Sequence, residues 1–307
     1  MTFSIYRNIV LDYLKRMPSL AHRELARLIA TEQDCIADCE RIYKLIRYYT
    51  GTSGVSNRKC LQDKTLAEAY AERTRINNIE NNIRFSKGNV LCYSCLHIPA
   101  QHPRALEFLI ELKKEYKPDL VVDLGDTFDV AQPSRHGGNP DIYSPSEELR
   151  ISKEEIKPFI ELFPKLLICE SNHTNRYFRA AKDANIPIGA MRTINDIYNL
   201  PKDWKFAPEW IIDNVVYRHG FGSAPAFVNA TRSGVSYVQG HLHSILDCKY
   251  ASSPFSCFFG ATSGCLVNPK AETMQYGFYS KARPVLGALI IHKGKNVTLK
   301  RMELGEE

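Results

Sequence analysis

Residues 120–129 read LVVDLGDTFD, and the fold of the chain is predicted from the pattern that this stretch shows. Four of its first five residues are aliphatic, which is typical of a buried strand, and polar residues follow where the run ends. Two similar runs flank it along the chain: VLCY at residues 90–93 and LLIC at residues 166–169. Segments with helical periodicity, 103–116 and 146–163, separate the three runs. This alternation predicts a βαβαβ unit whose sheet is buried on both faces.

The second half of the chain has a different pattern. Five later segments have strand composition with few helical segments between them: 210–217, 235–239, 256–261, 285–292 and 296–304. Parallel strands need long crossover connections, usually helices, so a purely doubly wound sheet does not fit this half. We therefore predict an α/β fold in which the strands form a mixed sandwich.

Side chains that bind metal ions follow five of the predicted strands. In chain order they are Cys95 and His97, Asp126 and Asp129, Asn172 and His173, His219, and His241 and His243. Because ligands of α/β proteins collect outside the carboxyl ends of strands, we expect these side chains to converge despite their distance in sequence. Histidine suits Mn, Fe and Zn, and asparagine supplies a carbonyl oxygen. The pattern predicts a metal centre at one edge of the sandwich.

The order of these motifs resembles the signature of the calcineurin-like metallophosphoesterases over residues 89–300. That family has D-x-H, G-D-x-x-D, G-N-H, a separate H and G-H-x-H, and this chain has CLH (95–97), GDTFD (125–129), SNH (171–173), His219 and GHLH (240–243). Within the superfamily, SNH with Arg176, followed by RHG and GHLH, looks most like the phosphoesterases encoded by tailed bacteriophages. The resemblance implies a metallophosphoesterase-type α/β/β/α sandwich with a two-metal site.

The resemblance also implies a role for each motif residue. It assigns His97, Asp126 and His243 to a first divalent ion, and Asp126, Asn172, His219 and His241 to a second. The implied reaction is hydrolysis of a phosphate ester by a hydroxide that bridges two ions, which would be Mn, Fe or Zn. His173 would protonate the leaving group or stabilise the transition state. From their own chemistry, we expect Asp129 to orient a histidine and Arg176 to contact a phosphate oxygen.

Three positions depart from the family pattern. Ser171 replaces a glycine and Thr174 an acidic residue, whereas Cys95 replaces the first metal-binding aspartate. A thiolate is softer than a carboxylate and favours Zn or Fe over Mg or Mn. Three interpretations of Cys95 stay open: it binds the ion and changes the metal preference, it stays a thiol and leaves the first site weak or empty, or it is an introduced change.

The length of 307 residues predicts about two domains. Residues 1–50 are predicted as a small all-helical domain with helices at 5–17, 20–30 and 35–49, residues 51–88 as a linker and connecting helix, and residues 89–307 as the metallophosphoesterase domain. Residues 1–88 carry 15 basic and 10 acidic side chains. This surplus suggests a nucleic-acid contact, with Arg41, Lys44 and Arg47 of the third helix as candidates. Two interpretations fit this segment: a helix-turn-helix-like module, and a small helical bundle that only packs on the rest of the protein.

Several classes of protein are disfavoured. The longest uncharged run, 250–269, contains Ser, Thr, Gly and Pro, so neither a membrane span nor a membrane partner is expected. Residues 1–18 do not read as a secretory signal, and nine cysteines without regular spacing suggest reduced thiols. We therefore expect a cytoplasmic protein, in the host cytoplasm if it is phage-encoded. Nucleotide-binding glycine loops are missing from the sequence.

The function expected from the sequence is that of a metal-dependent phosphoric ester hydrolase acting on nucleic acid or nucleotides, with DNA or RNA as the substrate partner. Two alternatives stay open. One is a phosphomonoesterase or cyclic-nucleotide phosphodiesterase without nucleic-acid binding. The other is a catalytically weakened metal-binding scaffold.

Overall fold

The computed structural model describes residues 6–17, 20–50, 82–83, 88–132, 143–252, 256–271 and 282–303. The chain divides into two compact units, Met1–Glu80 and Asn81–Glu307. Most of the segment predicted as linker and connecting helix lies outside the described residues. Among the described helices, none combines the length and apolar content that crossing a bilayer requires.

The first unit contains the three helices that the periodicity predicts. They are α1 (Arg7–Arg16), α2 (His22–Glu32) and α3 (Cys39–Tyr49), with the 3-10 turn η1 (Ile36–Asp38) before α3. Apolar side chains one turn apart, such as Ile42 and Ile46, are fully buried against Val10, Leu25 and Ile29. These contacts give the unit a hydrophobic core of its own.

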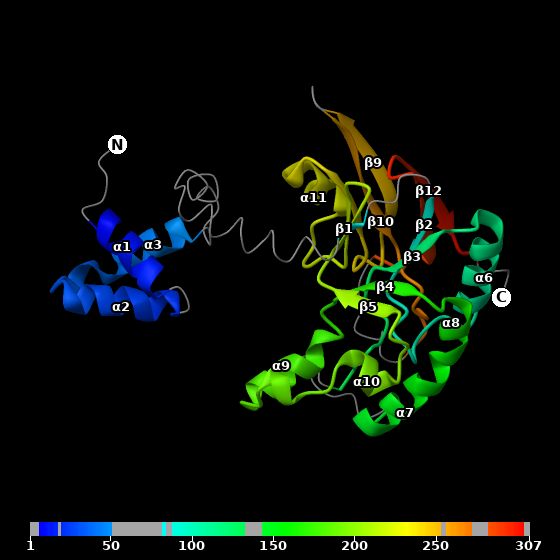
Figure 1. The fold of residues 1–307 in the computed structure, drawn as a ribbon, viewed down its shortest axis with the longest axis horizontal. Coiled ribbons are helices and arrows are strands. Elements are labelled where there is room, and N and C mark those ends of the chain that lie inside the picture. Colours follow the sequence, from blue (N-terminus) through cyan, green and yellow to red (C-terminus); the bar gives the residue numbers. More distant parts are fainter. Residues whose placement is uncertain are drawn as a thin grey trace. The chain divides into compact units, whose positions relative to one another are not determined.

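The second unit is built on two six-stranded sheets (Figure 1). The first sheet has the order β12-β11-β2-β3-β4-β5. Its strands are β2 (Asn89–Tyr93), β3 (Leu120–Asp123), β4 (Leu166–Cys169), β5 (Trp204–Ala207), β11 (Gly287–His292) and β12 (Asn296–Arg301). Strands β2 to β5 pair in parallel, and β11 pairs antiparallel with both β2 and β12. The three aliphatic runs of the sequence therefore lie side by side at the centre of this sheet.

The second sheet has the order β1-β6-β7-β8-β10-β9. Its strands are β1 (Asn82–Ile83), β6 (Trp210–Ile212), β7 (Val215–Arg218), β8 (Ser236–Gln239), β9 (Leu246–Ser252) and β10 (Cys257–Ser263). The prediction of a single strand over 210–217 is wrong, because β6 and β7 form an antiparallel hairpin. Asp213 and Asn214 make its turn with φ of 51° and 64°, the left-handed conformation of a two-residue hairpin loop.

Three apolar layers hold the sheets and helices together. Successive side chains along each strand of the first sheet point to opposite faces of the sheet. Val90 and Val122 pack with Val238 of the second sheet, whereas Leu91 faces the helices. The helices on that outer side are α6 (Ala105–Tyr116), α7 (Pro145–Glu155), α8 (Lys157–Leu162) and α10 (Ile194–Tyr198); α9 (Asn175–Asp183) and η3 (Ile188–Ala190) follow β4. The predicted α/β/β/α sandwich is confirmed.

Helix α11 (Ala226–Ser233) covers the outer face of the second sheet. Its approach depends on Gly260 in β10, where an added Cβ would lie 2.2 Å from the Cα of Phe227. Only glycine allows the helix backbone to come so close to the strand.

Candidate metal centre

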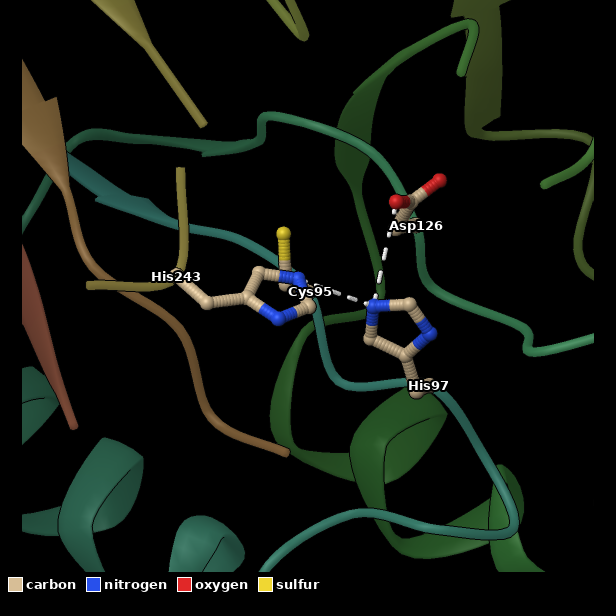
Figure 2. A group of neighbouring side chains, drawn as sticks. All are labelled: Cys95, His97, Asp126 and His243. Atoms are coloured by element: carbon tan, nitrogen blue, oxygen red, sulfur yellow. Dashed lines mark hydrogen bonds and ion pairs between the residues drawn. The ribbon is translucent and has the colours of Figure 1, made fainter. Parts of the chain in front are cut away.

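The predicted metal-binding side chains lie at the carboxyl ends of their strands and form two groups, and a third group of potential ligand atoms consists of His97, Asp129 and His173. The ligand atoms of the first group all lie within 4.8 Å of one another and come from Cys95, His97, Asp126 and His243 (Figure 2). The second group meets the same limit and consists of Asp126, His219 and His241. Asn172 joins the second group, because its Oδ1 lies 2.9 Å from Nε2 of His219. Asp126 is shared by both groups.

The backbone at the site adopts an unusual conformation. Cys95, His97, Asp126 and His241 have φ between 53° and 68°, in the left-handed region that non-glycine residues rarely occupy. Amides tie the loops after β2 and β3 together, since the backbone N–H of His97 donates to the carbonyl of Asp126 over 2.9 Å. Such strain concentrates at functional sites, where the surrounding structure enforces it.

Gly125 is required beside Asp126. Its φ is 98°, and an added Cβ would lie 2.8 Å from the carbonyl oxygen of Cys169 and 2.9 Å from Nδ1 of His219. Glycine therefore lets the loop after β3 pass close to two neighbouring strand ends.

The hydrogen bonds of two histidines fix their tautomers. Nδ1 of His219 donates to the carbonyl of Leu124 over 2.8 Å, so its Nε2 is unprotonated in the neutral ring. That Nε2 faces two oxygen atoms, Oδ1 of Asn172 at 2.9 Å and Oδ2 of Asp126 at 3.1 Å. A lone pair facing two oxygen acceptors is an arrangement that a cation between them stabilises.

His97 repeats this arrangement in the first group. Its Nδ1 lies 2.9 Å from Oδ1 of Asp129, and its Nε2 lies 3.2 Å from Nε2 of His243. Two imidazole nitrogens bound to one ion at about 2.0–2.1 Å are separated by roughly this distance. Asp129 is the residue expected to orient a histidine, and a carboxylate against the second ring nitrogen is the usual support of a metal-binding histidine.

Burial sets the charge state of the group. It lowers the pKa of His97 and lowers that of His243 to about 3, with the neighbouring imidazoles adding to both shifts. Burial raises the pKa of Asp126, but the facing His219 and His173 lower it by more than burial raises it. The pKa of Asp126 therefore lies well below its usual range. Neutral imidazoles around one ionised carboxylate are a suitable donor set for divalent ions such as Zn, Mn or Fe. The residues present fit the metal centre that the sequence predicts.

His173 lies next to the two groups and is held from both sides. Its Nδ1 lies 2.5 Å from the carbonyl oxygen of Asp129 and 3.1 Å from Oδ1 of the same residue. Its Nε2 lies 2.9 Å from Nη2 of Arg176 and 3.9 Å from Oδ2 of Asp126. Burial lowers the pKa of His173, but the carboxylates of Asp126 and Asp129 raise it more, so the net shift is upward.

Arg176 has contacts that the sequence does not predict. Its Nη1 donates to the carbonyls of Asp129 and Val130, each over 3.0 Å, and its Nη2 contacts His173. The guanidinium group therefore connects the loop after β3 with the start of α9. In this arrangement Arg176 positions His173, in addition to any contact with a phosphate oxygen.

Asp123, the last residue of β3, supports the site without having been predicted from the sequence. Its buried carboxylate accepts the N–H of Gly125 over 2.8 Å and the hydroxyl of Thr127 over 2.6 Å. These bonds brace the turn that carries Asp126. The available signal was an acidic residue at the end of an otherwise aliphatic strand, where a side chain without a partner would be costly.

Asp123 gives the first prediction. Burial raises its pKa from 3.8 to about 7, although the bonds from Thr127 and Gly125 oppose the shift. The protonated acid contributes fully to the free energy of unfolding below about pH 3.8, and this contribution is lost as pH rises through about 7. Asparagine resembles the protonated acid, so D123N should gain stability relative to the wild type across this window, measured by urea unfolding of metal-free protein. D123A, which removes both bonds, should lose about 1–3 kcal/mol at every pH. A constant difference between D123N and the wild type would contradict the assignment.

The three basic candidates of the first unit lie on α3. Arg41 and Lys44 are exposed, and Arg47 is half-buried. The ring of Tyr43 has the guanidinium carbon of Arg23 at 5.1 Å and that of Arg47 at 5.8 Å from its centre. Arginine and tyrosine thus form a mixed cluster on α2 and α3.

Comparisons with known proteins give structural similarity only. Neither a protein-family model nor a curated protein matches the chain. Similar solved structures include the phosphoesterase YfcE from E. coli, at 16% identity, covering 66% of this chain and 87% of that one, with a TM-score of 0.32. They also include a Vps29 mutant from Entamoeba histolytica (11%, 71% and 99%, TM-score 0.31) and the nuclease MPE from Pseudomonas putida (13%, 69% and 87%, TM-score 0.29). Because these sequence identities and TM-scores are low, we base the functional assignment on the geometry of the site.

Proposed function

We propose that the protein is a metal-dependent phosphoesterase that acts on nucleic acid or nucleotides. The observation that carries this proposal is the shared carboxylate: Oδ2 of Asp126 lies 3.1 Å from Nε2 of His219 and 3.7 Å from Nε2 of His97. Cys95, His97, Asp126 and His243 would hold one divalent ion, and Asp126, Asn172, His219 and His241 the other. When bound, such ions act as Lewis acids that neutralise charge on phosphate oxygens and acidify water.

The remaining residues would position the reacting groups. The backbone N–H of His173 donates to Oδ1 of Asp126 over 3.2 Å and so holds the shared carboxylate in place. Nδ1 of His173 donates to the carbonyl of Asp129, and its Nε2 accepts from Nη2 of Arg176. To act as a general acid, Nε2 would have to gain a proton and exchange the contact with Arg176 for one with the leaving group. Arg176 would fix the direction of that atom and add positive charge beside it.

The test is hydrolysis of bis(p-nitrophenyl) phosphate by protein that has been treated with chelator and then supplied with Mn, Zn or Fe. Turnover should require the metal, and elemental analysis should find two ions per chain in the active form. N172A, which removes one oxygen donor of the second group, should bind less metal and turn over more slowly. Equal rates with and without metal would overturn the proposal, and a protein that takes up no metal would instead be a scaffold.

The nucleic-acid part of the proposal is supported by the side chains of α3. Arg41 and Lys44 are exposed on one helix, and Arg47 lies against the ring of Tyr43 beside Arg23. Guanidinium and ammonium groups bind backbone phosphates, and an aromatic ring offers a surface on which a base can stack. A small helical unit that presents such a helix suits contact with a nucleic-acid backbone.

Neutralising α3 should weaken binding to a short DNA duplex. The triple variant R41Q/K44Q/R47Q should bind about tenfold or more weakly at low salt, with the slope of log K against log salt reduced by about 0.9 for each phosphate that the variant no longer neutralises. The matched control is R7Q/K15Q/R16Q on α1, which changes the net charge equally. Fluorescence anisotropy over a salt series measures the DNA affinity and its salt dependence for both variants. Unchanged DNA binding in the α3 variant would favour the phosphomonoesterase or cyclic-nucleotide alternative.

A further inference from the structure

The first group of ligands contains a sulfur atom, and the second does not. We propose that Cys95 binds the first ion as a thiolate, so that this position selects zinc over manganese or magnesium while the second position accepts harder ions. The inference rests on the proposed function, because it assumes that the first group holds an ion. It goes further by assigning the two positions different metal preferences.

The geometry places the sulfur among the other ligands. Cys95 is fully buried, and its Sγ lies within 4.8 Å of the ligand atoms of His97, Asp126 and His243. Figure 2 shows the four side chains coming together from three segments of the chain, with Cys95 and His97 on the same loop. Two hydrogen bonds hold the backbone of Cys95 in place: its N–H donates to the carbonyl of Gly125 over 2.9 Å, and its carbonyl accepts the N–H of Leu266 over 3.2 Å.

Other buried cysteines do not share this position. The thiol of Cys92 faces the carbonyl of Val90 in its own strand at 3.9 Å. Cys265 lies nearby, but its thiol is directed at the carbonyls of His243 and Val285, at 3.8 and 3.7 Å. Among the cysteines that the structure describes, Cys95 alone belongs to a group of potential metal ligands.

The donor chemistry of the group favours zinc. One thiolate, two imidazoles and one carboxylate are the ligand types that zinc takes in four-coordinate sites. Soft thiolate donors are poor ligands for magnesium and manganese, which prefer oxygen. The thiol must lose its proton to solvent as the sulfur–metal bond forms, so each ion bound there should release one proton from Cys95. The second group offers only nitrogen and oxygen, from Asp126, Asn172, His219 and His241, and has no such bias.

Cobalt(II) tests the proposal directly, because sulfur ligation gives a thiolate-to-cobalt charge-transfer band in the near ultraviolet. The wild type loaded with cobalt should show this band, and C95S and C95D should lose it while keeping the visible bands of cobalt in the second group. C257S, which alters an exposed cysteine, should keep it. Bound cobalt without the band in the wild type, or a band that survives in C95D, would overturn the thiolate assignment and leave the phosphoesterase proposal intact. Failure to bind any cobalt would overturn both.

A competition experiment measures the preference itself. Chelator-treated protein is dialysed against equal concentrations of zinc and manganese, and the bound metals are counted by elemental analysis. The zinc-to-manganese ratio of the wild type should exceed that of C95D by about tenfold or more, since even changes outside the ligand sphere alter metal affinity by that factor. Circular dichroism of C95D checks that it is folded. Equal ratios in the two proteins would overturn the inferred preference.

Discussion

D126N is expected to lower the rate of phosphodiester hydrolysis by about 10³-fold or more and to reduce the bound metal from two ions per chain. Asp126 belongs both to the group of Cys95, His97 and His243 and to the group of His219 and His241. Loss of one electrostatic group at an active site costs about 10²–10³-fold, and this carboxylate serves both positions. An amide at residue 126 would leave the imidazoles of His97 and His219, which lie 3.7 and 3.1 Å from Oδ2 of Asp126, without the negative charge that they share.

The measurement is kcat/KM for bis(p-nitrophenyl) phosphate at saturating metal, together with elemental analysis of each variant. D119N is the matched control, because Asp119 is exposed and accepts a hydrogen bond from the N–H of Asn89 at the start of β2, outside both groups of ligands. It should keep the metal content and rate of the wild type. A D126N protein with normal metal content and normal turnover would show that the shared carboxylate does not organise the site.

The centre of the fold could be predicted because its strands carry strong signals. Every residue of the runs that became β2, β3 and β4 is buried or half-buried, and most of these residues are aliphatic. Strand β9, at the edge of its sheet, was missed because the prediction relied on aliphatic runs, although the alternation of apolar and charged residues in β9 is itself typical of a half-buried strand. The hairpin of β6 and β7 was missed because its turn is Asp213-Asn214, without the glycine that usually marks such a turn.

Part of the site hypothesis follows from the strand order. Asp126 and Asn172 follow neighbouring parallel strands of one sheet, whose ends lie at the same edge. His219 follows β7 of the other sheet, and its place in the hypothesis came from the resemblance of the motif order to the metallophosphoesterases. The contacts of Arg176 and Asp123 could not be predicted in this way. Their partners are the carbonyls of Asp129 and Val130 and the amide of Gly125, and the direction of a backbone group depends on loop conformation, which residue identity does not encode.

H173A is expected to slow hydrolysis of an alkyl phosphodiester, such as a dinucleotide, by about 10²–10⁴-fold, the range that general acid catalysis contributes. With bis(p-nitrophenyl) phosphate the loss should be smaller, because nitrophenolate leaves without needing a proton. The expectation follows from how the ring is held: Nδ1 donates to the carbonyl of Asp129, and Nε2, which Nη2 of Arg176 contacts at 2.9 Å, lies 3.9 Å from Oδ2 of Asp126, beside the metal centre. A proton given from Nε2 would therefore reach a leaving group at the edge of that centre.

The comparison of two leaving groups separates proton transfer from other roles of His173. If the ring only supports the fold or the charge of the site, both substrates should lose the same factor in H173A. H292A is the matched control: His292 is a histidine of β11 that contacts Asn89 and Thr298, so both rates should stay at the wild-type level. R176K provides an intermediate case, since lysine keeps the positive charge but lacks the fork that contacts two carbonyls and His173 together. Because Arg176 acts through the orientation of His173, R176K should also affect the dinucleotide more than the nitrophenyl ester, by a smaller factor than H173A.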